Sequence, residues 1–220
     1  MAGEVGVEPT PTDLETGIQP LYYSPICALL FYLNLLFSAR YNKIMGNYRF
    51  DIVRPEYYRM ISDYREEMLK EGSNFDGCSS LERYEDIEKW HLNCLLFEKE
   101  DTVPPGYSVG FEYLYLNDKE IAGMLNLRPK ALSHIYLKQY GGHIGYSVRP
   151  SLRRQGIGTK MLRDFLPICK RDYHLDKVLI TCLKENEASR RVIINNGGVY
   201  ENDIFYPPAD ETLERYWISL

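Results

Sequence analysis

Residues 142–158 decide the fold, and they read GHIGYSVRPSLRRQGIG. The stretch 143–148 predicts a short strand that ends at Arg149-Pro150. Gly156 and Gly158 predict a tight turn after it. Apolar residues at i, i+3, i+4 and i+7 then predict a helix, and they are Leu162, Phe165, Leu166 and Cys169. The segment therefore predicts a strand, a glycine turn and a helix in succession.

This turn has the chemistry of a phosphate site. The first backbone N–H groups of a helix have no intrahelical partner, and the helix dipole places partial positive charge there. Glycines remove the β-carbons that would block a close approach, and Arg153 and Arg154 add charges that can pair with phosphate oxygens. Gly-x-Gly before a helix is also a common structural turn, so the pattern alone leaves both interpretations open.

Two rival phosphate signatures do not fit. A P-loop needs Gly-Lys-Ser/Thr, whereas the order here is Gly158-Thr159-Lys160. A dinucleotide-binding fold would place a third glycine near Met161. A different class of phosphate-bearing ligand is indicated.

Periodicity predicts further elements on both sides of the segment. Ahead of it we expect a strand at 48–53, a helix at 57–68, a helix that starts near Ser80, and strands at 107–116 and 120–127 joined by a turn at Asn117-Asp118. Residues 131–142 are ambiguous. Behind it we expect a buried strand at 178–183, a helix at 187–195 and one or two strands to the end, including 214–218. The order favours a mixed sheet.

Composition narrows the class of protein. A length of 220 residues favours a single domain with attachments. The balance of 26 basic and 31 acidic residues gives a net charge of -5, which argues against nonspecific nucleic-acid binding and suits a cationic acceptor slightly better. The five cysteines form no CxxC pair, which favours reduced thiols in the cytoplasm, and the four histidines have no zinc-site spacing. We expect no metal.

Residues 1–44 differ from the rest. Prolines are scattered through 1–25, and the apolar run 26–37 that follows is shorter than the ~20 residues of a membrane helix and has no basic residue ahead of it. We therefore expect no membrane contact. We expect 1–44 to be a flexible or spurious leader, with Met45 opening a domain that spans 45–220.

The segment 142–150, followed by Arg153-x-x-Gly156-x-Gly158, resembles motif A of the GCN5-related N-acetyltransferase (GNAT) family. The later Asn186-Glu187-Ala188-Ser189 and Gly197-Gly198 resemble that family's next motif, and the closest similarity is to a bacterial branch of uncharacterised acetyltransferases. The resemblance implies an α+β fold of three layers, with a mixed, mostly antiparallel sheet of about six to seven strands whose central strands splay apart, flanked by four helices.

The resemblance also implies the residues that bind acetyl-coenzyme A (acetyl-CoA). The pyrophosphate would lie on the turn, and the pantetheine arm would run along 146–148 like an added strand. Asn186 and Ser189 are expected on the other side of the arm. The complete expected set is Tyr146, Ser147, Val148, Arg153, Arg154, Gln155, Gly156, Ile157, Gly158, Thr159, Asn186 and Ser189.

Catalytic residues are less well defined by the resemblance. Many family members have an acidic residue near the place of His143 that acts as a base through water, and an imidazole titrates near neutrality. His143 is therefore our expected base, although a satisfied hydrogen-bonding residue at a strand start is an equal alternative. The tyrosine that often protonates the thiolate is replaced by Ile193, so Tyr200 is the expected substitute, with packing or protonation by solvent as alternatives.

The predicted function is direct acetyl transfer from acetyl-CoA to a primary amine of a small molecule or peptide. The alternative is a CoA-binding sensor or interaction module without turnover, which the substitution at Ile193 suggests. We expect a cytoplasmic enzyme with an amine acceptor as its partner and no nucleic acid, and we leave a homodimer open.

Overall fold

The computed structural model describes residues 47–220. The expected leader at 1–44, the apolar run at 26–37 and the proposed start at Met45 all lie outside the described residues. Within 47–220, no helix is long and apolar enough to cross a membrane. The rest of this section concerns that part of the chain.

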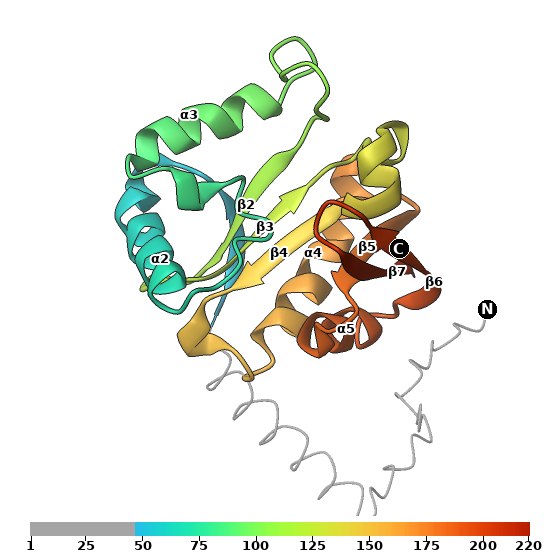
Figure 1. Cartoon of the computed structure of the whole chain (residues 1–220). Coiled ribbons are helices and arrows are strands. Elements are labelled where there is room, and N and C mark those ends of the chain that lie inside the picture. The colour runs from blue at the N-terminus through green and yellow to red at the C-terminus, as the bar shows by residue number, and fades with distance from the viewer. Residues whose placement is uncertain (1–46) are drawn as a thin grey trace, which may run out of the picture. The chain divides into compact units, whose positions relative to one another are not determined.

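The strands of residues 47–220 form two antiparallel sheets (Figure 1). The four-stranded sheet has the order β1-β2-β3-β4, and the three-stranded sheet has the order β5-β7-β6. Their bounds are β1 Arg49–Ile52, β2 Phe111–Leu116, β3 Ile121–Leu127, β4 Ile144–Val148, β5 Lys177–Leu183, β6 Val199–Tyr206 and β7 Glu211–Ser219. The expected α+β fold with a mostly antiparallel sheet is confirmed.

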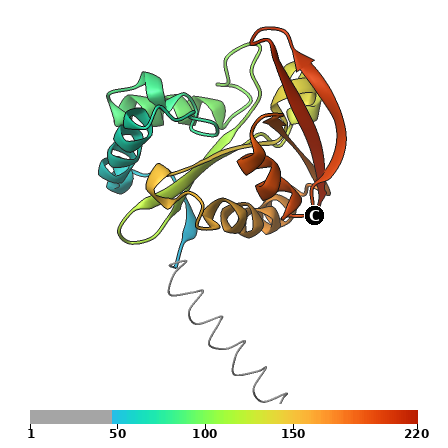
Figure 2. The same cartoon turned by 60° about the horizontal axis from the view of Figure 1, so that its bottom comes forward.

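Four α-helices flank the four-stranded sheet on its two faces (Figure 2). The helices α2 (Tyr58–Lys70) and α3 (Ile87–Phe97) pack on the face that carries Leu114 and Met124. The helices α4 (Ile157–Tyr173) and α5 (Glu187–Ile194) lie on the opposite face, which carries Leu125 and Leu127. Since side chains alternate along a strand, one sheet supplies two separate cores.

Two boundaries differ from the sequence prediction. The helix expected from Ser80 begins at Ile87. Ser79 and Ser80 have left-handed backbones (φ 46° and 61°) and lead only into a short 3-10 helix, Leu81–Arg83, while the Asp86 carboxylate caps α3 by accepting the N–H of Glu88. The strand expected from residue 107 begins at Phe111. The Gly110 N–H instead donates to the Phe97 carbonyl, which draws 107–110 away from the sheet.

The two sheets meet at His143, immediately before β4. The His143 N–H donates to the Leu179 carbonyl at 2.7 Å, and the Leu179 N–H donates to His143 Nδ1 at 2.9 Å. Gly142 makes this approach possible, since its φ of 62° and ψ of -169° suit glycine alone. A β-carbon there would lie 2.5 Å from the Leu179 oxygen.

Gly142→Ala should therefore destabilise the protein by roughly 2–4 kcal/mol, from backbone strain plus the clash with β5. Denaturant unfolding monitored by circular dichroism measures this. Gly72→Ala is the matched control, since Gly72 has φ 57° with no atom within 4 Å of its added β-carbon, and it should cost only about 1 kcal/mol. Equal losses in the two variants would contradict the close approach at Gly142.

Candidate active site

The outer edge of β4 carries peptide groups that face away from the sheet. Arg149 N–H donates to the Ala122 carbonyl of β3 and Arg128 N–H donates to the His143 carbonyl, so the odd-numbered residues of β4 bond to β3. The peptide groups of Tyr146 and Val148 therefore face the other way, toward β5. In the described chain β4 ends its sheet, and beyond His143 it is paired with β3 alone. The strands thus splay as the resemblance implied.

The turn before α4 lies beside the end of this edge. Gly156 is the N-cap residue with φ 80°, and no side chain caps the helix. The Lys160 N–H makes the first intrahelical bond, to the Gly156 carbonyl, so the amides of Ile157, Gly158 and Thr159 precede the bonded ladder. A β-carbon on Gly158 would lie 3.2 Å from Val192 and 3.4 Å from Val148.

The arginines of the turn have different positions. The Arg153 guanidinium donates to the Val148 carbonyl and to Ser73 Oγ, at 3.0 Å and 2.9 Å, so it fastens the turn to the strand. Arg154 is exposed and has φ 59°. The Gln155 side chain donates to the Ser151 carbonyl. Both arginines are exposed, but among the described residues Arg154 makes no side-chain hydrogen bond or ion pair, so its guanidinium is the one left to bind a ligand.

Glu67 of α2 holds the same region from the other side. Its carboxylate pairs with Arg149 at 2.7 Å and accepts the Ser151 N–H at 2.7 Å. Burial opposes the charge of Glu67, but the hydrogen bonds from Ser151 and then those from Arg149 hold its pKa below the usual value. Glu67, one of the acidic residues of this helix, thus has a structural role.

The start of α5 faces β4 through a hydrogen bond. The Asn186 side chain caps α5 by accepting the Ser189 N–H at 3.0 Å. The Ser189 hydroxyl lies 3.0 Å from the Tyr146 hydroxyl. The expected residues Tyr146 and Ser189 are thus brought together, and Asn186 reaches the site through its cap.

Ser147 has a different environment from the one expected. Its side chain is buried and bonds to the Tyr64 hydroxyl at 2.9 Å and to Cys78 at 3.0 Å, on the α2 face. Its peptide N–H belongs to the set that bonds to β3. Tyr146, rather than Ser147, therefore has the outward amide.

His143 is buried, with 1% of its surface exposed. Its Nδ1 accepts the Leu179 N–H, and burial lowers its pKa to about 4, with the Arg128 charge acting in the same direction. A base needs a free lone pair beside the substrate. The geometry favours the alternative in which His143 joins β4 to β5.

The structure places Tyr200 on β6 and Ile193 in the core beneath α5. Tyr200 is 52% exposed on β6, and its hydroxyl donates to Asp203 at 2.9 Å. Ile193 is fully buried in the core under α5. The structure does not bring Tyr200 together with Tyr146 and Ser189.

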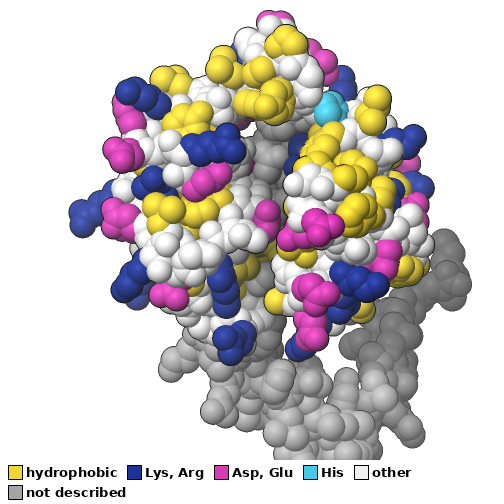
Figure 3. All heavy atoms as spheres, in the orientation of Figure 1, with side chains coloured by type: hydrophobic (Ala, Val, Ile, Leu, Met, Phe, Trp, Pro, Cys, Tyr) yellow, Lys and Arg dark blue, Asp and Glu magenta, His cyan; other side chains and the backbone are white. Residues whose placement is uncertain are grey.

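A cavity of about 420 Å³ lies on the opposite face of the sheet, and sequence reasoning missed it. Its walls come from four separate segments: residues 79–80, α3, the loop 106–110 and the stretch from Asn126 to Leu137. Figure 3 shows the surface hollowed between the α2–α3 side and the C-terminal strands, with hydrophobic side chains along the rim. Asn126 and Arg128 line it beside Gly145 of β4.

Comparisons with known proteins agree with this geometry. A family model described as an acetyltransferase (GNAT) domain matches residues 62–199. No curated protein sequence matches the chain. The chain is similar in fold to three solved structures, described next.

RimL, a ribosomal L7/L12 alpha-N-protein acetyltransferase in complex with coenzyme A, is 18% identical with a TM-score of 0.58, over 80% of this chain and 96% of that one. RimJ from Mycobacterium smegmatis, in complex with CoA-disulfide, is 20% identical with a TM-score of 0.58, over 77% of this chain and 80% of that one. The microcin C7 self-immunity acetyltransferase MccE, in complex with acetyl-CoA and AMP, is 11% identical with a TM-score of 0.59, over 81% of this chain and 95% of that one.

The His143 joint predicts a pH dependence of stability. The folded imidazole stays neutral down to about pH 4, whereas the unfolded one binds a proton near 6.5. Its contribution is therefore present above pH 6.5 and is lost as the pH falls toward 4.

In His143→Asn the new Oδ1 can accept the Leu179 N–H, so this variant should keep most of the unfolding free energy at pH 7. Its unfolding free energy should fall less than that of the wild type between pH 6.5 and 4. His143→Ala leaves that N–H unbonded and should cost roughly 1–3 kcal/mol at pH 7. Unfolding free energies across this pH range measure both effects. An alanine variant as stable as the wild type would exclude the joint.

Proposed function

The chain belongs to the GNAT acetyltransferase family, and on that premise we propose that it transfers an acetyl group from acetyl-CoA directly to a primary amine. The observation that carries this proposal is the outward edge of β4 beside the uncapped start of α4. Acetyl-CoA supplies the activated acetyl group, and the protein binds it, orients it and moves protons.

The diphosphate site is built from peptide groups. The amides of Ile157, Gly158 and Thr159 would bind the diphosphate, with Gly156 shaping the turn and Arg154 adding charge. Gln155 and Arg153 hold the loop to its neighbours. RimL and MccE are described as complexes with coenzyme A and acetyl-CoA, which supports the same ligand here.

The pantetheine arm would bond to the outward peptide groups of Tyr146 and Val148, as an added strand would. Since the Val148 carbonyl already accepts from Arg153, the Tyr146 carbonyl and the Val148 N–H would make this pairing. The Tyr146 N–H is the donor we assign to the thioester oxygen, where negative charge develops during attack. Asn186 would act by holding the start of α5 against the arm.

The Tyr146 hydroxyl is our candidate acid for the departing thiolate. It lies beside Ser189, near the helix position where Ile193 replaces the family's tyrosine. Burial raises the pKa of Tyr146 well above its usual value, so the hydroxyl is protonated at neutral pH and can donate a hydrogen bond to the sulfur as negative charge develops on it.

The described cysteines Cys78, Cys94, Cys169 and Cys182 are buried and unpaired with one another, which fits a reducing cytoplasm. RimL is described as acting on a protein α-amine, so peptide and small-molecule amines both remain candidates for the acceptor.

Calorimetric titration with acetyl-CoA, followed by a thiol-release assay against an amine panel, tests the function. Arg154→Asn keeps a residue that tolerates the left-handed backbone and removes the charge, so the affinity should fall about tenfold, equivalent to ~1.4 kcal/mol. Arg163→Asn, at an exposed arginine farther along α4, is the control and should bind normally. Equal affinities in the two variants would count against the turn as the diphosphate site. Binding without thiol release for any amine would favour the non-catalytic alternative.

Tyr146→Phe should lower kcat about tenfold or more and leave the affinity for acetyl-CoA within twofold, because only the proton donor is lost. Tyr200→Phe makes the same chemical change at the tyrosine on β6 and should leave kcat unchanged. Steady-state thiol release measures both. The opposite ranking would assign the acid to Tyr200, and two unaffected variants would indicate protonation by solvent.

A further inference from the structure

A buried carboxylate lies directly behind the wall of the cavity. Glu112 of β2 is 4% exposed, and its Oε2 accepts from Ser79 Oγ at 2.6 Å and from Asn126 Nδ2 at 3.3 Å. Its Oε1 has no hydrogen-bond partner in the described chain. Burying a carboxylate with an unbonded oxygen is costly. Because packing alone does not offset this cost, we expect a chemical role for Glu112.

The sheet register aligns this carboxylate with the edge of β4. Glu112 pairs with Asn126, and Asn126 pairs with Gly145. Directly paired residues of antiparallel strands point to the same face, so these three positions form one row across β2, β3 and β4. The row ends one residue from Tyr146, the donor that we assign to the thioester.

The titratable groups around Glu112 come from three segments. They are Arg128 immediately after β3, Asp76 and Cys78 of the loop that follows α2, and Cys94 of α3. Burial raises the pKa of Glu112 to about 8, while the bonds from Ser79 and Asn126 and the Arg128 charge act in the other direction. A carboxyl group of this kind exchanges protons near neutral pH.

We infer that Ser79 binds the ammonium group of the acceptor in this cavity and that Glu112 takes its proton through the Ser79 hydroxyl, an inference that rests on the proposed acetyl transfer. One ammonium N–H bond breaks as Ser79 Oγ gains that proton, and the Ser79 O–H bond breaks as Glu112 Oε2 gains the other. The ammonium becomes a neutral amine with a lone pair, the carboxylate becomes a carboxylic acid, and the serine is regenerated. Ser79 contacts the acceptor, and Glu112 is a positioning residue that stores the proton.

The cavity walls indicate the class of amine. The rings of Phe97 and Tyr107 lie edge to face with centroids 5.5 Å apart, and both line the cavity. The Arg128 charge in the same wall opposes a second positive charge on the acceptor. The acceptor is therefore a monoamine on an apolar or aromatic body.

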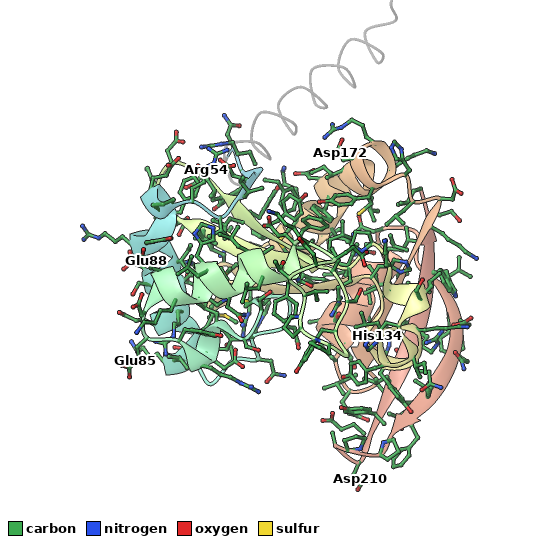
Figure 4. All side chains as sticks on the ribbon, turned by 90° about the horizontal axis from the view of Figure 1, so that it is seen from above. Arg54, Glu85, Glu88, His134, Asp172 and Asp210 are labelled. Atoms are coloured by element: carbon green, nitrogen blue, oxygen red, sulfur yellow. The ribbon has the colours of Figure 1, made fainter. Side chains whose placement is uncertain are left out.

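A contact between two loops also lines the cavity. His134 Nε2 lies 2.6 Å from the Gly106 carbonyl, which ties residues 131–141 to the loop 106–110. Figure 4 shows His134 on that segment, over the C-terminal strands and across from α3. This contact thus forms part of the cavity wall.

The test uses the full chain, with 2-phenylethylamine and spermidine as probes. The wild type should have a kcat/KM for 2-phenylethylamine at least tenfold higher than its kcat/KM for spermidine. Glu112→Gln should lower kcat/KM for that amine about 100-fold at pH 7. In the wild type kcat/KM should rise with pH through about 8, as Glu112 loses its own proton, whereas in Glu112→Gln the rise should move toward the pKa of the free amine.

Ser79→Gly should give the same loss, because it removes the hydroxymethyl group and with it the relay. Glycine suits the φ of 46°, so this variant decides the question if Glu112→Gln does not fold. Glu98→Gln, the same change at the carboxylate that ends α3, should keep wild-type kcat/KM.

Acetyl-CoA affinity should be unchanged in Glu112→Gln, Ser79→Gly and Glu98→Gln, which separates this inference from the proposed function. Failure of the wild type to bind acetyl-CoA or to release thiol with any amine would overturn both. Normal turnover and an unshifted pH profile in Glu112→Gln would overturn the relay alone, and a preference for spermidine would overturn the acceptor class.

Discussion

The proposed ligand site depends on the separation of β4 from β5. The two strands meet through the His143 peptide and imidazole, both bonded to Leu179, and β4 then continues with one edge unpaired by β5. Peptide groups that lack a partner in the fold require one from outside it. A linear ligand with amide groups can supply that partner along the strand, and the start of α4 can bind its charged end.

β4 also divides the chemistry between the two faces of the sheet. Its even-numbered side chains, such as Tyr146, point toward α4 and α5, where the Ser189 hydroxyl meets the Tyr146 hydroxyl. Its odd-numbered positions, such as Gly145, point toward α2, α3 and the cavity. The proposed thiolate acid and amine relay thus approach the reacting atoms from opposite sides. This separation lets a proton enter at the thiolate and leave from the amine without exchange between the two.

Local patterns in the sequence predicted the strand, turn and helix at 142–173 because each depends on neighbouring residues. The role of Ser147 could not be read in this way, since the direction of its amide depends on its register with Met124 of β3. Glu112 gave no signal at all, because the cavity in front of it is assembled from four distant segments. The start of α3 was misplaced for a local reason, as Ser80 leads only into the short 3-10 helix Leu81–Arg83 and Asp86 supplies the cap of α3.

Amide hydrogen exchange, resolved by residue with and without saturating acetyl-CoA, tests most directly whether the edge of β4 and the start of α4 bind the ligand together. Exchange should slow at the amides of Tyr146, Ile157, Gly158 and Thr159, with little change at amides such as Met124 that are already bonded within the sheet. Tight binding of acetyl-CoA with no slowing at those four amides would contradict this account of the site.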